Sequence, residues 1–190
     1  GYEAQAEVNA DNCMSCGLCV GSCPTATPFR RAGEIVPGIE LPLHPIAGLR
    51  ERTVSASKEF VKGRRILIYA CEHSNSERLD NDNARVITLP CVAALPPSFI
   101  DFVLSRNLAD GVAISGCADG DCYYRLGGAW TQQRIDGERD PYLRKRVDRE
   151  RLRFWRYRAS GGGRQRALET FTAELKALPK NRAGRRFSDA

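Results

Sequence analysis

Apolar positions along the chain follow two periods, one typical of buried strands and one typical of amphipathic helices. Three short apolar runs rich in β-branched residues predict strands. They are residues 65–71, 86–89 and 111–115. Residues 97–108 begin with proline and repeat apolar side chains on one helical face, which predicts a helix. Strands that alternate with helices indicate an α/β fold with a mostly parallel sheet.

The remaining segments complete a provisional division of the chain. Residues 152–158 are either a fourth strand or the continuation of a basic helix from Tyr142, and residues 164–178 predict a closing helix. Five prolines between positions 24 and 45 indicate a wrapping segment or linker. We expect a small N-terminal module in residues 1–45, a linker or helix in 46–63, the α/β domain in 64–180 and a basic tail in 181–190.

Four of the eight cysteines follow the predicted strands. Cys71, Cys91 and Cys117 each stand at or just after the carboxyl end of a strand, and Cys122 comes five residues after Cys117. Parallel strands end at one edge of their sheet, where ligands gather. We therefore expect a metal site of four thiols at this edge.

The other four cysteines form a tight motif near the N-terminus. Cys13, Cys16, Cys19 and Cys23 fit C-x2-C-x2-C-x3-C-P, with Pro24 as the final residue. Such closely consecutive thiols suit the irons of a 4Fe–4S cluster, whereas zinc sites use paired knuckles that lie far apart. The motif resembles the bacterial-type ferredoxin module, in which it occurs twice and the fourth cysteine ligates the other cluster. Here it occurs once, so Cys23 either completes the local cluster or serves a second cluster outside residues 1–190.

Residues 112–128, which contain Gly-Cys117-x4-Cys122-Tyr-Tyr, resemble the delta subunit of methyl-viologen-reducing hydrogenase. Tyr-Ala-Cys71, Leu-Pro-Cys91 and residues 152–159 are similar to other parts of that family, and the resemblance extends over residues 64–179. It implies a flavodoxin-like fold, a 2Fe–2S cluster on the four cysteines, and the strand interpretation of residues 152–158. Ser74 and Ala94 stand where members often have cysteine and arginine.

Competing interpretations use the same residues. The four later cysteines would also suit a zinc site, and His73 with His44 would be needed for a Rieske-type centre. Ser-Gly-Gly-Gly at 160–163 is expected to be a turn rather than a phosphate site, since it lacks the P-loop lysine. Asp119 and Asp121 are expected to shape the loop between two ligating cysteines. The sequence contains no recognisable nucleophile-and-base arrangement for catalysis.

Charge and composition change this picture little. The formal net charge of +6 is concentrated in residues 134–166, and residues 144–158 interleave arginines with aromatic rings. That pattern occurs on nucleic-acid-binding surfaces, on surfaces that dock acidic redox partners, and on ordinary solvated faces. No apolar run is long enough for a membrane span and no secretory signal is visible, so we expect a cytoplasmic location in which clustered thiols bind metal rather than form disulfides. The alternative is a location at the cytoplasmic face of the membrane, through a partner or a missing upstream segment.

Together these patterns predict an iron–sulfur electron-transfer protein or domain, part of a larger complex, that catalyses no bond chemistry by itself. The family resemblance implies a donor such as a hydrogenase or formate dehydrogenase. It also implies an acceptor such as a heterodisulfide-reductase-type flavoprotein carrying FAD, or a quinone-linked or membrane cytochrome partner. The alternative is a zinc-stabilised nucleic-acid-binding module, which only the basic segment favours.

Overall fold

The three predicted strands and residues 152–157 form one four-stranded sheet. The computed structural model describes residues 5–29, 37–158 and 163–181. Its strands are β1 (Ile66–Cys71), β2 (Ala84–Leu89), β3 (Gly111–Cys117) and β4 (Leu152–Tyr157). All neighbouring strands are parallel, in the order β2-β1-β3-β4. This order is the beginning of the flavodoxin-like arrangement, whose switch point lies between β1 and β3. The prediction of a parallel α/β sheet is confirmed.

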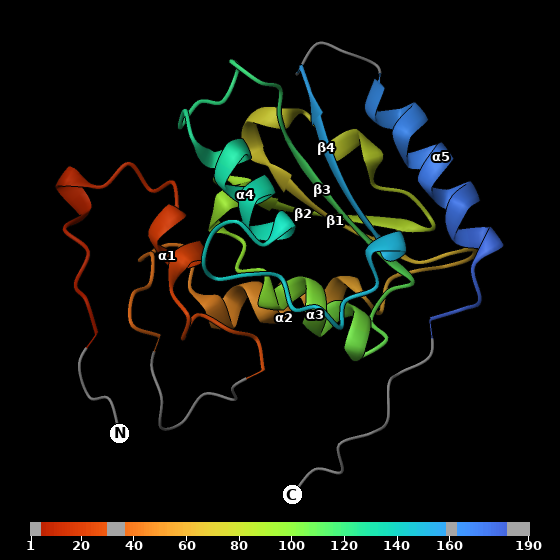
Figure 1. Cartoon of the computed structure of the whole chain (residues 1–190), viewed down its shortest axis with the longest axis horizontal. Helices are drawn as coiled ribbons and strands as arrows, with labels where there is room; N and C mark the ends of the chain where they lie inside the picture. Colours follow the sequence, from red (N-terminus) through yellow and green to blue (C-terminus); the bar gives the residue numbers. More distant parts are fainter. Residues whose placement is uncertain (1–4, 30–36, 159–162, 182–190) are drawn as a thin grey trace, which may run out of the picture.

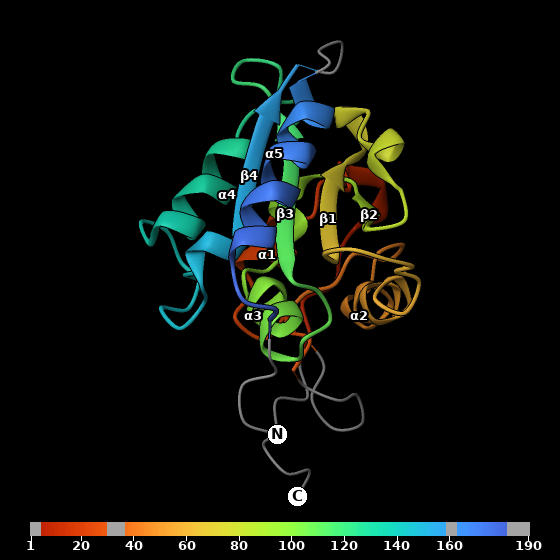
Figure 2. The same ribbon diagram turned by 90° about the vertical axis from the view of Figure 1, so that its right-hand side faces the viewer.

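Both faces of the sheet are covered because its central strands are apolar on both sides. Leu67, Tyr69 and Ile114 face one core, which is covered by α2 (Ile46–Ala56), α3 (Ser98–Ser105) and α4 (Gly127–Asp136). Ile68 and Trp155 face the other core, which is covered by α5 (Gly163–Ala177). Figure 1 shows α5 on one side of the sheet and α2 and α3 on the other. In Figure 2, α5 crosses in front of β3 and β4.

Several element boundaries differ from the predictions for local reasons. Helix α3 stops at Ser105, short of residue 108, because Asn107 adopts a left-handed backbone with φ of +54°. Residues 152–157 form a strand rather than a helix. Helix α4 was not predicted, and it ends at Gly137, whose φ is +85°. The turn expected at residues 160–163 falls largely outside the described residues.

The N-terminal segment packs against the α/β domain rather than standing apart from it. It contains the short helix α1 (Leu18–Ser22) and lies next to α4 in Figure 1. Val20, Ala26 and Leu41 are buried and belong to the same apolar core as Leu95 of the domain. Among the described residues, no helix has the length and apolarity that a bilayer crossing requires.

Candidate metal centres

The first cysteine group lies on a coiled loop that leads into α1. Ser15 and Gly17 have φ of +53° and +73°, so two left-handed residues wind the chain between Cys13 and Cys19. The Ser15 amide donates to Cys13 Sγ at 3.3 Å. Burial raises the pKa of Cys19, and the thiols of Cys16 and Cys13 contribute in the same direction. The loop thus presents three neighbouring thiols with a backbone amide directed at sulfur, as an iron–sulfur loop requires.

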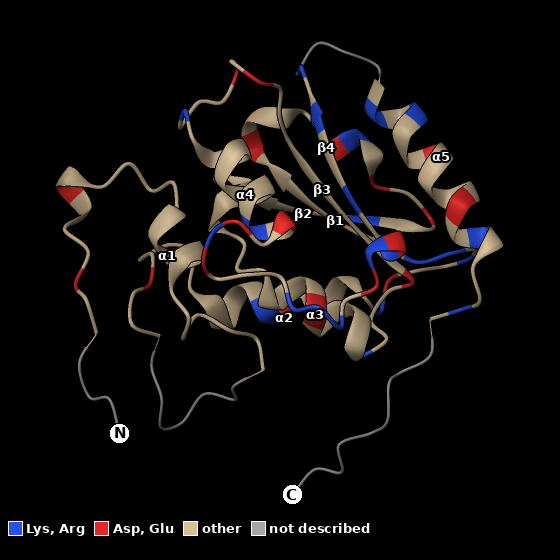
Figure 3. Cartoon of the chain, in the orientation of Figure 1, with Lys and Arg blue, Asp and Glu red and all other residues tan. Residues whose placement is uncertain are grey.

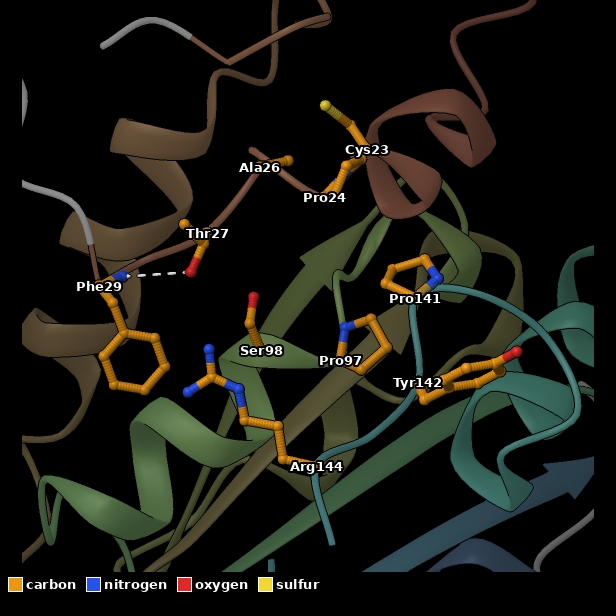
Figure 4. A pocket seen from close by; sticks show the side chains of 10 residues that line it. All are labelled: Cys23, Pro24, Ala26, Thr27, Phe29, Pro97, Ser98, Pro141, Tyr142 and Arg144. Carbon is orange, nitrogen blue, oxygen red and sulfur yellow. Dashed lines mark hydrogen bonds between the residues drawn. The ribbon is translucent and has the colours of Figure 1, made fainter. Parts of the chain in front are cut away.

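Cys23 occupies a different environment from the other three. Its Sγ lies 3.0 Å from Thr25 Oγ1, which also accepts a hydrogen bond from the Gly38 amide at 2.7 Å. Burial opposes ionisation of Cys23, but hydrogen bonds from Thr25 and from the amides of residues 25, 26 and 38 outweigh it and lower its pKa. Cys23 also borders a cavity of about 270 Å³ between the N-terminal segment and the domain, shown in Figure 4. Its surroundings therefore suit a thiolate.

Two thiols of the second group meet at the switch point of the sheet. Cys71 ends β1 and Cys117 ends β3, and their sulfur atoms lie 3.8 Å apart. The hydrogen bond between the two thiols lowers the pKa of Cys117 against the opposing effect of burial, and the same bond, together with burial, raises the pKa of Cys71. A tetrahedral metal with metal–sulfur bonds of about 2.3 Å holds its sulfurs about 3.8 Å apart. This pair therefore has the spacing of two ligands on one metal atom.

The other two thiols of the second group meet at the start of α4. A Cβ added at Gly127 would overlap Cys91 Sγ and would lie 3.5 Å from Cys122 Sγ. Both sulfurs thus face the same point beside the first residue of the helix. Burial raises the pKa of Cys91 to about 12, and the nearby Cys122 thiol contributes in the same direction. Sequence spacing alone predicted the four thiols at one edge, but the division into two pairs is visible only in the structure.

Within the residues that the structure describes, no three His, Cys, Asp or Glu side chains converge on a point where they could hold one ion. The eight free cysteines are instead arranged as a loop of three, a separate Cys23 and two pairs. His73 and His44 form no joint site there, so the Rieske arrangement has no geometric support. The His73 ring stacks on Tyr123, with ring centres 4.3 Å apart. Tyr123, which is 62% exposed, lies beside Cys122 at the surface.

Two buried arginines flank the cysteines on opposite faces of the sheet. Arg134 of α4 is 1% exposed, and Arg164 of α5 is 4% exposed. Neither forms an ion pair with a carboxylate among the described residues. Burial lowers the pKa of both guanidinium groups, while nearby thiols, Cys91 for Arg134 and Cys117 for Arg164, oppose that effect. Buried cations without carboxylate partners suit a site that becomes negative when its thiols bind metal.

Unused hydrogen-bond donors surround the second group. Arg134 Nε, Arg156 Nε and His73 Nε2 are buried and have no hydrogen-bond partner among the described residues. His73 Nε2 lies 3.4 Å from Glu72 Oε1 without forming a hydrogen bond. A buried N–H without a partner is costly. These donors therefore fit a bound group that supplies acceptor atoms, such as the sulfides of an iron–sulfur cluster. Sequence reasoning considered His73 only as a Rieske-type ligand and found neither arginine as a site residue, because burial of an arginine leaves no periodic signal.

Most arginines of the basic segment at residues 144–158 form ion pairs within the chain. Arg144 and Arg146 both pair with the buried Asp101, at 3.0 and 2.6 Å. The remaining ion pairs of the segment are Arg151–Asp148, Arg153–Glu174, Arg156–Asp119 and Arg158–Asp121. Figure 3 shows acidic residues close to these basic ones. The two aspartates between the cysteines are thus partners of Arg156 in β4 and of Arg158 just after it, so most arginines of the segment have an acidic partner within the chain.

Two family models match the chain in the regions that carry the cysteines. The model described as methyl-viologen-reducing hydrogenase, delta subunit, matches residues 66–179. The model described as a 4Fe-4S binding domain matches residues 6–28. The first match contains both pairs of thiols, and the second contains the loop with Cys13, Cys16, Cys19 and Cys23.

Individual relatives agree with these matches. The iron-sulfur subunit of the F420-non-reducing hydrogenase vhc of Methanococcus voltae is 32% identical over 95 residues, which cover 50% of this chain and 65% of that protein. One subunit of the ferredoxin:CoB-CoM heterodisulfide reductase of Methanosarcina mazei is 31% identical over 97 residues, which cover 50% of this chain and 12% of that protein. The chain therefore spans slightly less than two thirds of the first relative and a small part of the second.

Proposed function

The chain belongs to the methyl-viologen-reducing hydrogenase delta-subunit family and carries a 4Fe-4S binding domain, and from this premise we propose that it relays single electrons between two iron–sulfur centres. The first centre would be a 4Fe–4S cluster on the loop of Cys13, Cys16 and Cys19. The second would be a 2Fe–2S cluster on Cys71, Cys91, Cys117 and Cys122. When bound, such clusters supply reversible one-electron chemistry.

The arrangement of the later thiols in two pairs carries the proposal of a 2Fe–2S centre. In a 2Fe–2S cluster, each iron takes two protein ligands. The Cys71–Cys117 pair and the Cys91–Cys122 pair supply that division, and their separation argues against four thiols around a single zinc. The chain's residues would hold the metal, exclude water through buried Cys71 and Cys91, and compensate negative charge through Arg134 and Arg164.

The names of the relatives support the proposed redox partners. One relative is the iron–sulfur component of a hydrogenase, and another is a component of a heterodisulfide reductase. We propose a hydrogenase or formate dehydrogenase as donor. The proposed acceptor is a flavoprotein of the heterodisulfide-reductase type, or a quinone-linked or membrane cytochrome partner. Clustered thiols also favour a reducing, cytoplasmic location.

Iron content and paramagnetic resonance test the proposal. Protein purified without oxygen should contain about six irons per chain and show two reducible centres. Cys122→Ser should remove the 2Fe–2S signal and keep the 4Fe–4S signal, whereas Cys16→Ser should do the reverse, so each variant controls the other. About two zinc ions with no iron would overturn electron transfer and favour the zinc alternative.

The same measurement applied to Cys23→Ser addresses the fourth cysteine of the motif. If Cys23 serves a cluster outside residues 1–190, this variant keeps the iron content and spectrum of the chain. We favour that outcome because Cys23 followed by Pro24 is the signature of the two-cluster module, in which the fourth cysteine ligates the other cluster. Conversion of the first centre to a three-iron form would show that Cys23 completes the local cluster.

A further inference from the structure

One guanidinium group joins the two cysteine-bearing parts of the chain. Arg134 Nη1 donates to the Ala93 carbonyl at 2.9 Å, and Ala93 lies two residues after Cys91. Its Nη2 donates to the Leu18 carbonyl at 3.4 Å and to Ser22 Oγ, and these two residues begin and end α1. The side chain is 1% exposed. Arg134 therefore connects the segment between Cys16 and Cys23 to the turn that carries Cys91.

Two glycines allow the parts to approach this closely. A Cβ at Gly17 would overlap the Ala94 side chain, and a Cβ at Gly21 would overlap the Ala93 carbonyl and lie 2.7 Å from Arg134 Nη1. Gly17 directly follows Cys16, and Ala94 lies three residues after Cys91. The two cysteine groups thus approach each other at this contact.

The chemistry of Arg134 extends beyond packing. It has no carboxylate partner in the described part of the chain, and its Nε is a buried donor without an acceptor. The planar guanidinium binds three acceptors through Nη1 and Nη2 while Nε remains free on the same rigid fork. A lysine would keep the charge but could not hold this set of acceptors in one geometry.

We propose that Arg134 is a positioning residue, and this proposal rests on the proposed electron transfer. Arg134 holds the first cysteine loop against the Cys91 turn and so sets the electronic coupling between the two centres. Its main-chain bonds determine the relative placement of the two parts. Its buried charge and free Nε–H act on the centre at Cys91, since hydrogen bonds and charge near the sulfurs shift the potential of an iron–sulfur centre.

Arg134→Met and Arg134→Lys test this role, with Arg151→Met as a matched control. Arg151 is also buried and donates to two main-chain carbonyls, Asp110 at 3.0 Å and Pro179 at 2.7 Å, but these groups belong to neither cysteine-bearing segment. Hydrogen exchange of the anaerobically purified chain reports the docking of α1 whether or not clusters are bound. Spin–spin interaction between the reduced centres, together with their potentials, reports the coupling.

In Arg134→Met, amides of residues 18–23 should exchange at least about tenfold faster, the effect of losing one hydrogen bond from a charged donor. The spin–spin interaction should weaken, and the potential of the Cys91 centre should fall. Arg134→Lys should restore the potential more than the spin–spin interaction, and Arg151→Met should change neither.

If Arg134→Met fails to fold, the Ser22→Ala variant replaces it. Ser22→Ala removes one acceptor of Arg134 and should give a smaller change in the same direction. Unchanged exchange and coupling in folded Arg134 variants would overturn the proposal, whereas absence of iron from the unaltered chain would overturn only the proposed function.

Discussion

Gly127 is the residue at which the second site has least room. Its missing side chain leaves space for Cys91 Sγ, whereas a Cβ on the adjacent Gly128 would lie 3.5 Å from Arg156 Nε, an ordinary contact. Gly127→Ala should displace the Cys91 thiol, reduce the iron content by the two irons of the second centre, and destabilise the fold by about 1–3 kcal/mol through overpacking. Iron analysis and urea unfolding measure these effects.

Gly128→Ala is the matched control for this prediction, because it lies in the same helix turn. It should keep the iron and change stability by less than about 1 kcal/mol, since it mainly restricts the unfolded chain. Equal iron content in the two variants would show that Cys91 does not need the space at Gly127.

The hydrogen-bonded thiols of Cys71 and Cys117 should give the metal-free chain an unusually acidic thiol. The bond between the two thiols lowers the pKa of Cys117, so at least one thiol should ionise well below the ordinary value of about 8.5. Between its folded and unfolded pKa values, Cys117 binds fewer protons in the folded chain. Its stabilising contribution is therefore fully present above about pH 8.5 and is lost as the pH falls through its folded pKa.

Titration of thiolate absorbance in the metal-free chain measures this acidic step. Cys117→Ser should abolish it and Cys71→Ala should move it to higher pH, because the hydrogen bond between the two side chains is lost. Cys91→Ser should leave it in place, since burial raises the pKa of that thiol to about 12. Persistence of the step in Cys117→Ser would assign it to another residue.

At the scale of elements, Arg164 ties the start of α5 to the ends of β3 and β4. Its Nε donates to Ser115 Oγ at 3.2 Å and its Nη1 to the Arg158 carbonyl at 2.8 Å. From Ser115, hydrogen bonds continue through Ser76 and Ser74 to the Cys71 carbonyl. The same helix end thus supports both strands that carry the Cys71–Cys117 pair.

Arg164→Met should therefore lower the free energy of unfolding by about 2–4 kcal/mol, because several buried acceptors lose a charged donor. Arg166→Met, on the exposed side of the same helix, should change it by less than about 0.5 kcal/mol. Urea unfolding of the two variants measures the difference. A loss below about 1 kcal/mol for Arg164→Met would mean that water replaces the guanidinium at these acceptors.

The sequence predicted the strands of this fold better than its helices. Residues 66–71 form a continuous apolar run because both faces of the sheet are buried, and such a run is easily recognised as a strand in the sequence. Helix α4 was not predicted because it begins with Gly127 and Gly128 and has few apolar residues, although Gly137 directly after it is a typical residue at a helix end. The cysteines could be recognised as candidate sites from their spacing and from their positions at the ends of predicted strands. Their pairing and the buried arginines depend on contacts between residues far apart in the chain, which local patterns do not record.

At the scale of the whole molecule, the basic composition is partly offset by ion pairs among the residues that the structure describes. The arginines of residues 144–158 are largely paired within the chain, and two oxidised clusters would reduce the formal net charge from +6 to about +2. We expect duplex DNA to bind more weakly than a dissociation constant of about 10⁻⁴ M at physiological salt, the weak limit of non-specific binding. Fluorescence anisotropy with labelled DNA measures this.

The double variant Asp119→Asn, Asp121→Asn serves as the positive control for DNA binding. It releases Arg156 and Arg158 from their ion pairs and should strengthen DNA binding in a salt-dependent way. Salt-sensitive binding by the unaltered chain at micromolar concentration would contradict the internal neutralisation of the segment.

The contact between the first cysteine loop and the Cys91 turn is formed mainly by glycines and main-chain carbonyls, joined by one arginine. Such a contact depends on few side-chain identities, so most positions on either surface are free to diverge without separating the two parts. Gly17, Gly21 and Arg134 depend on one another at this contact, and we expect all three to be present together in related chains. Chains that have lost the N-terminal module should be free to replace Arg134, and the joint presence or absence of the three residues would then record which descendants still use the contact.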